Sequence, residues 1–335
     1  MNIVLMFSAD EVPKYTRHML RGYPFEIFDP ESTYSQPTAF LYDMYGPYQD
    51  FIKQHLEQGH KVIYDAKNEH YVNPGKHWVL DEFMKHPGQG MFLISGHEPQ
   101  DITGVTVAAT PYWYWINDQM NFREFGYDRY QWNPTYEFDF FMQLSLSRAD
   151  RDVLHNMLTP VLHRGLYSYR SQGIFLPSDV DPVTVPNWQR YTNFDWIDRC
   201  NLTLVVESNL DDDLITGFSI TKNDSWFLCE KTYKPIAYGH PFLQAGTRGN
   251  LDYVRQMGFE TFPELWDESY SDLPHYTDRI RAIVNIIQSF DPAALLKSSV
   301  REKLKHNQAR FFDTELTTRF LTETVTDPIL EFASD

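Results

Sequence analysis

The chain has 335 residues, of which 42% are hydrophobic and 16% aromatic, and its formal net charge is −17. This size and composition predict a folded chain of two domains and disfavour intrinsic disorder. The acidic balance disfavours tight, sequence-independent binding to a nucleic-acid backbone, because such binding depends on Lys and Arg neutralising phosphates. The two cysteines, Cys200 and Cys229, indicate a reducing, cytoplasmic compartment rather than a disulfide framework.

The first part of the chain alternates short apolar runs with helical patterns. Strands are predicted at 3–7, 61–64, 91–95 and 105–108, with helical patterns around 51–56 and 76–85 between them. Such alternation is typical of βαβ units over a parallel sheet. The apolar run at the N-terminus is too short for a signal peptide, and no run is long enough to span a membrane.

The second part continues the same pattern after a predicted linker at 131–135. Strands are predicted at 138–146, 202–206 and 242–245, and helices at 150–158 and 250–257. We therefore expect an α/β fold with two Rossmann-like αβα domains that face a cleft. The predicted domains are 1–133 and 134–310, followed by a helical tail at 311–335 that packs back on the body.

The second part also places charged side chains just after its predicted strands or at the start of its predicted helices. Six of them form the candidate site: Arg148, Arg151, Glu207, Glu230, Lys231 and Lys234. Ligands of open α/β sheets bind beyond the carboxyl ends of the strands, and a helix N-terminus attracts anions. The cations suit a diphosphate, and the carboxylates suit ribose or sugar hydroxyls. The alternative is a set of solvated side chains at helix ends.

Two further patterns allow two interpretations each. The run Tyr112-Trp113-Tyr114-Trp115 suits stacking on an acceptor sugar or base, or else the packing of a strand into the core. The turn Gly246-Thr247-Arg248-Gly249 suits a phosphate or is a plain turn. Asp179-Val180-Asp181 and Asp211-Asp212-Asp213 are interpreted as solvated loops, and no metal site is predicted.

The segment 227–246 resembles the donor-binding region of the α1,3-fucosyltransferase family and its viral and bacterial relatives. That family has a strand ending in Glu-Asn-Ser, then an aromatic segment leading to Thr-Glu-Lys at a helix start, then Gly and a strand that begins with Pro. The matching stretches here are Val206-Glu207-Ser208-Asn209, Phe227-Leu228-Cys229-Glu230-Lys231 and Gly239-His240-Pro241-Phe242. Arg151 best matches the arginine that opens a helix in the family.

The match has two departures, since Cys229 replaces the family's Thr and Ser208-Asn209 reverses the order of Asn and Ser. The residues around 258–270 are similar to uncharacterised phage glycosyltransferase-like proteins. The resemblance implies a GT-B arrangement and an inverting, metal-independent transfer from a nucleotide-diphosphate sugar, GDP- or UDP-linked, with no other cofactor. The acceptor is expected to be a hydroxyl of a glycan or of a modified DNA base.

The resemblance also implies roles for residues. Arg151 and Lys231 would contact the diphosphate, Glu230 would contact ribose or sugar hydroxyls, and Glu207 would support the same site. An inverting transfer needs a general base, expected in the first domain. Of the carboxylates after its predicted strands, Glu98 and Glu11 are the candidates. The alternative function is a non-catalytic carbohydrate- or nucleotide-binding protein on the same fold.

Overall fold

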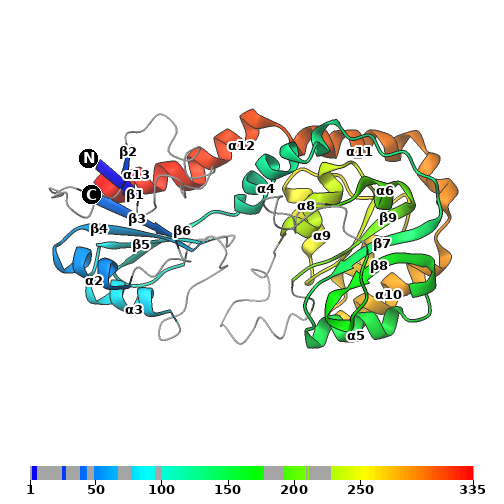
Figure 1. Cartoon of the computed structure of the whole chain (residues 1–335), viewed down its shortest axis with the longest axis horizontal. Helices are drawn as coiled ribbons and strands as arrows, with labels where there is room; N and C mark the ends of the chain where they lie inside the picture. The colour runs from blue at the N-terminus through cyan, green and yellow to red at the C-terminus, as the bar shows by residue number, and fades with distance from the viewer. Residues whose placement is uncertain are drawn as a thin grey trace. The chain divides into compact units, whose positions relative to one another are not determined.

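The structure is a computed structural model that describes residues 2–5, 25–27, 38–43, 49–66, 77–94, 100–176, 192–208, 210 and 228–334. The chain forms two compact units (Figure 1). Unit 1 combines Met1–Asn117 with Thr314–Asp335, and unit 2 is Asp118–Asp313. This division differs from the predicted one, because residues 118–133 belong to unit 2. None of the described helices is long and apolar enough to cross a membrane.

Unit 1 contains a parallel sheet whose described strands follow the order β2-β1-β3-β4-β5-β6. Their bounds are β1 (Asn2–Leu5), β2 (Phe25–Ile27), β3 (Thr38–Asp43), β4 (Lys61–Ala66), β5 (Gly90–Ile94) and β6 (Val105–Ala109). The order reverses between β1 and β3, as in doubly wound α/β sheets. The predicted parallel α/β architecture is thus confirmed.

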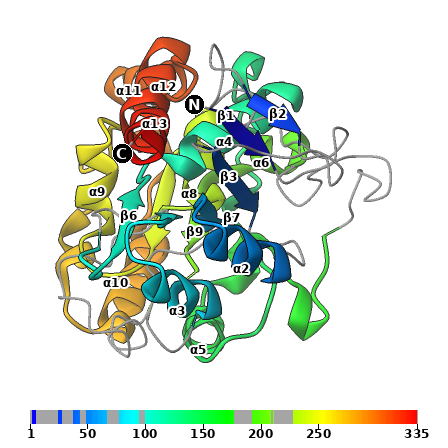
Figure 2. The ribbon, with the colours of Figure 1, turned by 90° about the vertical axis from the view of Figure 1, so that its left-hand side faces the viewer.

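Helices cover both faces of this sheet. They are α2 (Gln49–Glu57), α3 (Trp78–Lys85), α12 (Thr314–Leu321), the π-helical turn η7 (Thr322–Thr326) and α13 (Asp327–Ser334). Phe40 and Phe92 pack with α2 and α3, whereas Leu41 and Leu93 pack with η7 and α13. Because neighbouring side chains of a strand point to opposite faces, each strand supplies both cores. Figure 2 shows α2 and α3 on one side of the sheet and α12 and α13 on the other.

Residues 113–115 of the aromatic run are helical, so the strand that was one of its two interpretations is not formed. Helix α4 (Trp113–Glu124) begins at Trp113, two residues after Pro111. Proline at the start of a helix loses no intrahelical hydrogen bond, which favours this geometry. Trp113 and Trp115 are buried, and Tyr112 stacks on Phe320 with 3.8 Å between ring centroids. The two tryptophan side chains therefore pack in the hydrophobic core.

Unit 2 contains a second parallel sheet, with the order β10-β9-β7-β8 among the described strands. Its strands are β7 (Phe138–Leu144), β8 (Gly165–Tyr169), β9 (Cys200–Val206) and β10 (Phe242–Ala245). Three of these were predicted, and β8 was not. The order again reverses, here between β7 and β9, so unit 2 also has a topological switch point.

The helices of unit 2 lie on both sides of its sheet. They are α5 (Ala149–Leu158), α6 (Phe194–Asp198), α8 (Glu230–Ala237), α9 (Asn250–Gln256), α10 (Tyr276–Ser289) and α11 (Ser298–Phe311). In Figure 1, α5 and α10 lie below the sheet, and α8 and α11 lie above it. The predicted helices at 150–158 and 250–257 are confirmed. Along the chain, α5 follows β7 directly. In space, α8 begins at the carboxyl end of β9.

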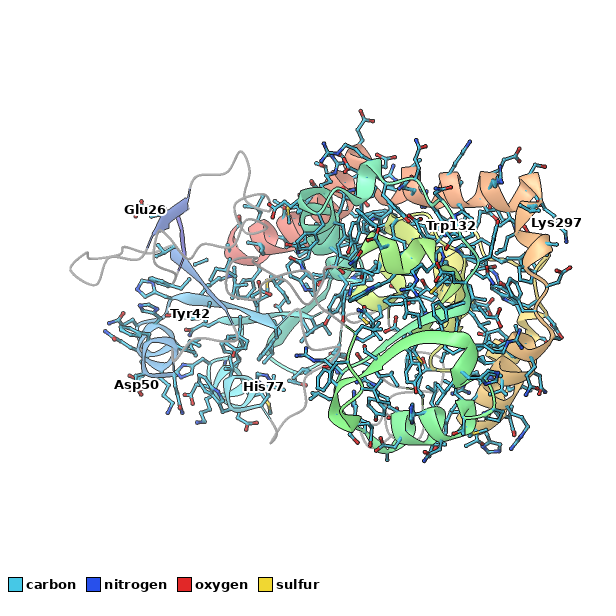
Figure 3. The ribbon with its side chains drawn as sticks, turned by 45° about the vertical axis from the view of Figure 1, so that its right-hand side comes forward. Glu26, Tyr42, Asp50, His77, Trp132 and Lys297 are labelled. Atoms are coloured by element: carbon cyan, nitrogen blue, oxygen red, sulfur yellow. The ribbon has the colours of Figure 1, made fainter. Side chains whose placement is uncertain are left out.

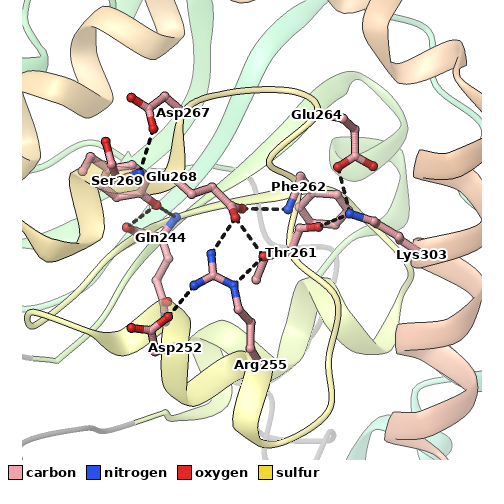
Figure 4. A network of polar contacts seen from close by, with 11 residues as sticks. Gln244, Asp252, Arg255, Thr261, Phe262, Glu264, Asp267, Glu268, Ser269 and Lys303 are labelled. Carbon is pink, nitrogen blue, oxygen red and sulfur yellow. Dashed lines mark hydrogen bonds and ion pairs between the residues drawn. The ribbon is translucent and has the colours of Figure 1, made fainter.

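A polar network beyond β10 joins α9 to the loop that follows it (Figure 4). The buried carboxylate of Glu268 accepts hydrogen bonds from Arg255 Nη2 at 2.7 Å, Thr261 Oγ1 at 2.8 Å and the Phe262 N–H at 2.7 Å. Arg255 also pairs with Asp252 at 2.5 Å, on the surface of α9. Glu268 therefore supplies the buried centre of this network, and Asp252 its exposed edge.

We expect Glu268→Gln to lower the free energy of unfolding by about 1–3 kcal/mol, because a buried acceptor of three hydrogen bonds is replaced. The matched control, Asp252→Asn, should cost less than about 1 kcal/mol, since exposed ion pairs contribute little. The Glu268 side chain is 6% exposed and that of Asp252 is 52% exposed. Urea denaturation measures both, and equal losses would contradict the assigned roles.

A cluster of buried rings in unit 1 contains a histidine that stays neutral. His55 of α2 stacks on Phe40 at 3.6 Å, and its Nδ1 lies 2.6 Å from the Tyr42 hydroxyl. Figure 3 labels Tyr42 on the sheet and Asp50 on α2. Burial, reinforced by the nearby His60, lowers the pKa of His55 from 6.5 to about 4. The fold therefore favours the uncharged imidazole.

The stability that neutral His55 contributes should be complete above pH 6.5 and should be lost as the pH falls towards 4. Between about pH 7 and about pH 5, the unfolding free energy of wild type should fall by about 2 kcal/mol more than that of His55→Gln. Urea denaturation at the two pH values measures this difference. The same pH slope in both proteins would show that His55 is not the group responsible.

Candidate functional site

The segments after β7 and β9 are bonded to each other at the switch point of unit 2. Arg148, at the N-cap of α5, donates from Nη1 to the carbonyl oxygen of Ser208 at 2.6 Å. Asp150, in the first turn of α5, accepts the N–H of Leu210 on Oδ2 at 3.0 Å. These contacts fix the residues that follow β9 against the start of α5. They form the edge of the sheet where ligands of this fold class bind.

Lys231 joins the same edge from the first turn of α8. Its Nζ donates to Glu230 Oε1 at 2.9 Å, to Cys229 Sγ at 3.2 Å and to Ser208 Oγ at 3.3 Å. An ammonium group has three protons, so each proton has one of these acceptors. Ser208 thus contacts both Lys231 and Arg148. Ser208 therefore links Lys231 to Arg148. The sequence had instead favoured Arg151 as the second cation of the diphosphate site.

Glu207 holds the start of α8 from the end of β9. Its Oε1 accepts the Cys229 N–H at 3.3 Å and the Thr232 hydroxyl at 2.5 Å, and its Oε2 accepts the Cys229 thiol at 2.7 Å. Cys229 is the N-cap of α8, but its own side chain makes no capping hydrogen bond. The carboxylate of Glu207 therefore accepts the backbone N–H of the N-cap residue, as the glutamate of a capping box does. The Glu207 side chain is buried, with 1% of the residue exposed, so it supports the site from inside the fold.

The charges in this cluster stabilise one another. Burial favours neutral Glu230, but the ammonium groups of Lys231 and Lys234 lower the pKa of Glu230 to about 2. Burial likewise opposes the charge of Lys231, yet Cys229 and the carboxylates of Glu230 and Glu207 raise its pKa. Burial and both carboxylates raise the pKa of Cys229 well above its ordinary value. At neutral pH the cluster therefore contains the ionised carboxylate of Glu230, the ammonium of Lys231 and the protonated thiol of Cys229.

Arg151 lies in the first turn of α5 and is 6% exposed. Its Nη1 donates to the carbonyl oxygen of Leu146 at 3.3 Å, and its backbone N–H donates to Asp150 Oδ1 at 2.9 Å. Its Nε is buried and has no hydrogen-bond partner within the described part of the chain. A buried guanidinium with an unused donor is costly unless a further acceptor reaches it. Arg151 therefore retains capacity to bind an anion at this edge.

Lys234 lies deeper than Lys231, on the side of α8 that faces the sheet. It is 7% exposed, and its Nζ lies 3.4 Å from Gln143 Oε1. Both lysines line a cavity of about 30 Å³ with residues of β7 and β9. That volume suits about one water molecule and is too small for a diphosphate. The structure thus places Lys234 between α8 and the sheet, on the inner side of the site.

The two predicted bases, Glu98 and Glu11, lie outside the described residues, as do both Asp-x-Asp stretches. At the predicted turn after β10, Thr247 Oγ1 donates to Asn250 Oδ1 at 2.8 Å, and Gly249 adopts φ 79° as the N-cap of α9. This geometry starts a helix. Among the described residues, no group of three His, Cys, Asp or Glu side chains is arranged to hold a metal ion.

Sequence reasoning missed two residues of the cluster. Ser208 is the common partner of Arg148 and Lys231, and Thr232 links Glu207 to Gln244 of β10, whose Nε2 lies 2.8 Å from the Thr232 hydroxyl. The signal for Ser208 was its position directly after Glu207 at a strand end. Thr232 carried no comparable signal, because a threonine inside a helix is common.

We expect Glu207→Gln to destabilise the protein by about 1–3 kcal/mol, because an amide nitrogen replaces an oxygen that accepts a buried hydrogen bond. Glu230→Gln is the matched control and should cost less, since its side chain is 28% exposed. Urea denaturation gives both values. An unfolding midpoint of Glu207→Gln equal to that of wild type would contradict the proposed capping of α8.

A comparison with known protein families finds no matching family model, and a comparison with curated proteins finds no match. The resemblance to the α1,3-fucosyltransferase family therefore stays a prediction from local motifs. The arrangement of charges at the end of β7 and β9 carries the functional argument. That arrangement is a set of cations and one ionised, partly exposed carboxylate at the switch point of a parallel sheet.

Proposed function

We propose that the chain is an inverting, metal-independent glycosyltransferase of GT-B architecture that uses a nucleotide-diphosphate sugar. Unit 2 would bind the donor, and unit 1 would supply the acceptor side. The observation that carries the proposal is the meeting of Arg148 and Lys231 at Ser208, at the β7–β9 switch point. Switch points are where doubly wound sheets bind nucleotides.

The diphosphate is the part of the donor that this site suits best. Helices α5 and α8 both begin at this edge, so their first N–H groups and partial positive charge favour an anion. Arg148, Arg151 and Lys231 add full positive charges. When the glycosidic bond breaks, the leaving nucleoside diphosphate gains negative charge, which these fixed cations would stabilise.

Glu230 supplies a carboxylate that can accept hydrogen bonds from the hydroxyls of a sugar. Its carboxylate is ionised at neutral pH, because its pKa is lowered to about 2 by the adjacent ammonium groups against the effect of burial. One oxygen binds Lys231 at 2.9 Å, and the carboxylate can accept further hydrogen bonds. Ribose or sugar hydroxyls are donors of the right kind. We therefore propose Glu230 as the contact that orients the donor.

Inversion requires a base that removes the proton of the acceptor hydroxyl. As that oxygen bonds to the anomeric carbon, the nucleoside diphosphate leaves with the bonding electron pair, and the base retains the proton. We propose Glu98 or Glu11 for this step, from their places after predicted strands of unit 1. The acceptor would be a glycan or a hydroxymethylated DNA base.

Calorimetric titration with GDP, UDP and their sugars tests donor binding directly. Lys231→Met and Arg148→Met should each weaken binding by about tenfold or more, because each removes a charge-assisted hydrogen bond. Lys85→Met is the matched control, since Lys85 is an exposed lysine of unit 1 that pairs with Glu82. The proposal fails if no nucleotide binds wild type, or if Lys231→Met and Lys85→Met behave alike.

Turnover distinguishes the enzyme from a non-catalytic nucleotide- or carbohydrate-binding protein on the same fold. Purified wild-type protein should slowly hydrolyse the donor that it binds and should transfer its sugar to an acceptor. Glu98→Gln or Glu11→Gln should abolish transfer but retain nucleotide binding. Binding without hydrolysis or transfer to either glycans or hydroxymethylated DNA would instead favour the binding protein.

A further inference from the structure

Cys229 lies between two charged groups of the cluster. Its Sγ is 2.7 Å from Glu207 Oε2 and 3.2 Å from Lys231 Nζ. The residue is 1% exposed and occupies the N-cap of α8 with extended backbone angles. The capping role belongs to Glu207, so the thiol is available for these two contacts.

The direction of both hydrogen bonds follows from the groups involved. An ammonium can only donate, so the sulfur of Cys229 accepts from Lys231, and the S–H of Cys229 donates to Glu207 Oε2. A thiolate at this position would face the Glu207 carboxylate at 2.7 Å without a proton between them. The thiol therefore stays protonated, and the hydrogen bonds run from Lys231 through Cys229 to Glu207.

We propose that Cys229 is a positioning residue that holds the Lys231 ammonium in place for a phosphate group, and this inference rests on the proposed function. Within the described part of the chain, Lys231 also donates to its chain neighbour Glu230 and to the Ser208 hydroxyl. Without the thiol, the hydrogen-bonded link from the ammonium through position 229 to the buried Glu207 would be lost. The thiol thus sets where Lys231 lies relative to Ser208 and Arg148.

The chemistry of sulfur suits this task. A thiol is a weak acceptor, so Lys231 can turn one N–H towards a phosphate oxygen with little loss. A cation that is already in place also avoids the cost of ordering a long side chain on binding. A hydroxyl at this position can make the same two hydrogen bonds, whereas a methyl group can make neither. Serine and alanine at position 229 therefore separate positioning from simple packing.

The first test observes the thiol itself by infrared spectroscopy. The sequence has one other cysteine, Cys200, so Cys200→Ala leaves Cys229 as the sole source of the S–H stretching band. Donation to a carboxylate should place this band at lower frequency than that of Cys200 in the Cys229→Ser protein. Adding Glu207→Gln or Lys231→Met should shift the Cys229 band. A band at the frequency of a free thiol, unchanged by both substitutions, would overturn the proposal.

The second test measures binding of whichever of GDP or UDP the wild type binds more tightly. Cys229→Ala should weaken binding about tenfold, and Cys229→Ser should restore it to within about threefold of wild type. Equal affinities of the alanine and serine variants would contradict positioning by the hydrogen bonds. Circular dichroism establishes that each variant folds, and if the alanine variant does not, the infrared band decides. If wild type binds no nucleotide, the proposed function fails, and the infrared shifts still test the link separately.

Discussion

The buried carboxylate of Glu207 is the constraint on which the site of unit 2 depends. It stands at the end of β9 and binds the backbone, thiol and hydroxyl groups of the first turn of α8. A buried carboxylate is stable only when its oxygens are hydrogen-bonded, so the position of α8 is fixed by the strand end. Lys231 and Glu230 are the side chains that this arrangement presents at the edge of the sheet.

The strand order of the fold explains why these groups meet at the switch point. Both sheets are parallel, and both reverse their strand order beside their first strand, between β1 and β3 and between β7 and β9. At a reversal, the connections leave on opposite sides of the sheet and leave the strand ends accessible. In unit 2 the segments after the two strands are then bonded through Arg148 and Ser208 and through Asp150 and Leu210. Packing of alternate side chains on both faces makes that edge rigid.

The sequence predicted the regular elements of this fold well, because strands buried on both faces are short, continuous apolar runs. It missed β8, an edge strand in which Gly165, Ser168 and two tyrosines obscure the apolar pattern. A strand was one of two interpretations of 112–115, where burial of Trp113 and Trp115 in a helix overrides the local β preference of aromatic residues. The boundary between residues 117 and 118 could not be located from composition, since α4 runs through residues 113–124 without a break.

For the site, the sequence identified the charged residues but not their roles. Position after a strand indicated Glu207, yet only the structure reveals that its carboxylate is used within the fold. The sequence grouped Lys234 with Lys231 in the candidate site, but Lys234 faces the sheet. The partnership of Arg148 with Ser208 depends on the strand order, which local patterns do not encode.

The most direct measurement is a crystal structure of the protein soaked with GDP or UDP. The account predicts density for the diphosphate beyond the carboxyl ends of β7 and β9, with phosphate oxygens within hydrogen-bond distance of Lys231 and of Arg148 or Arg151. A nucleotide bound elsewhere, with Lys231 still held only by Glu230, Cys229 and Ser208, would contradict it.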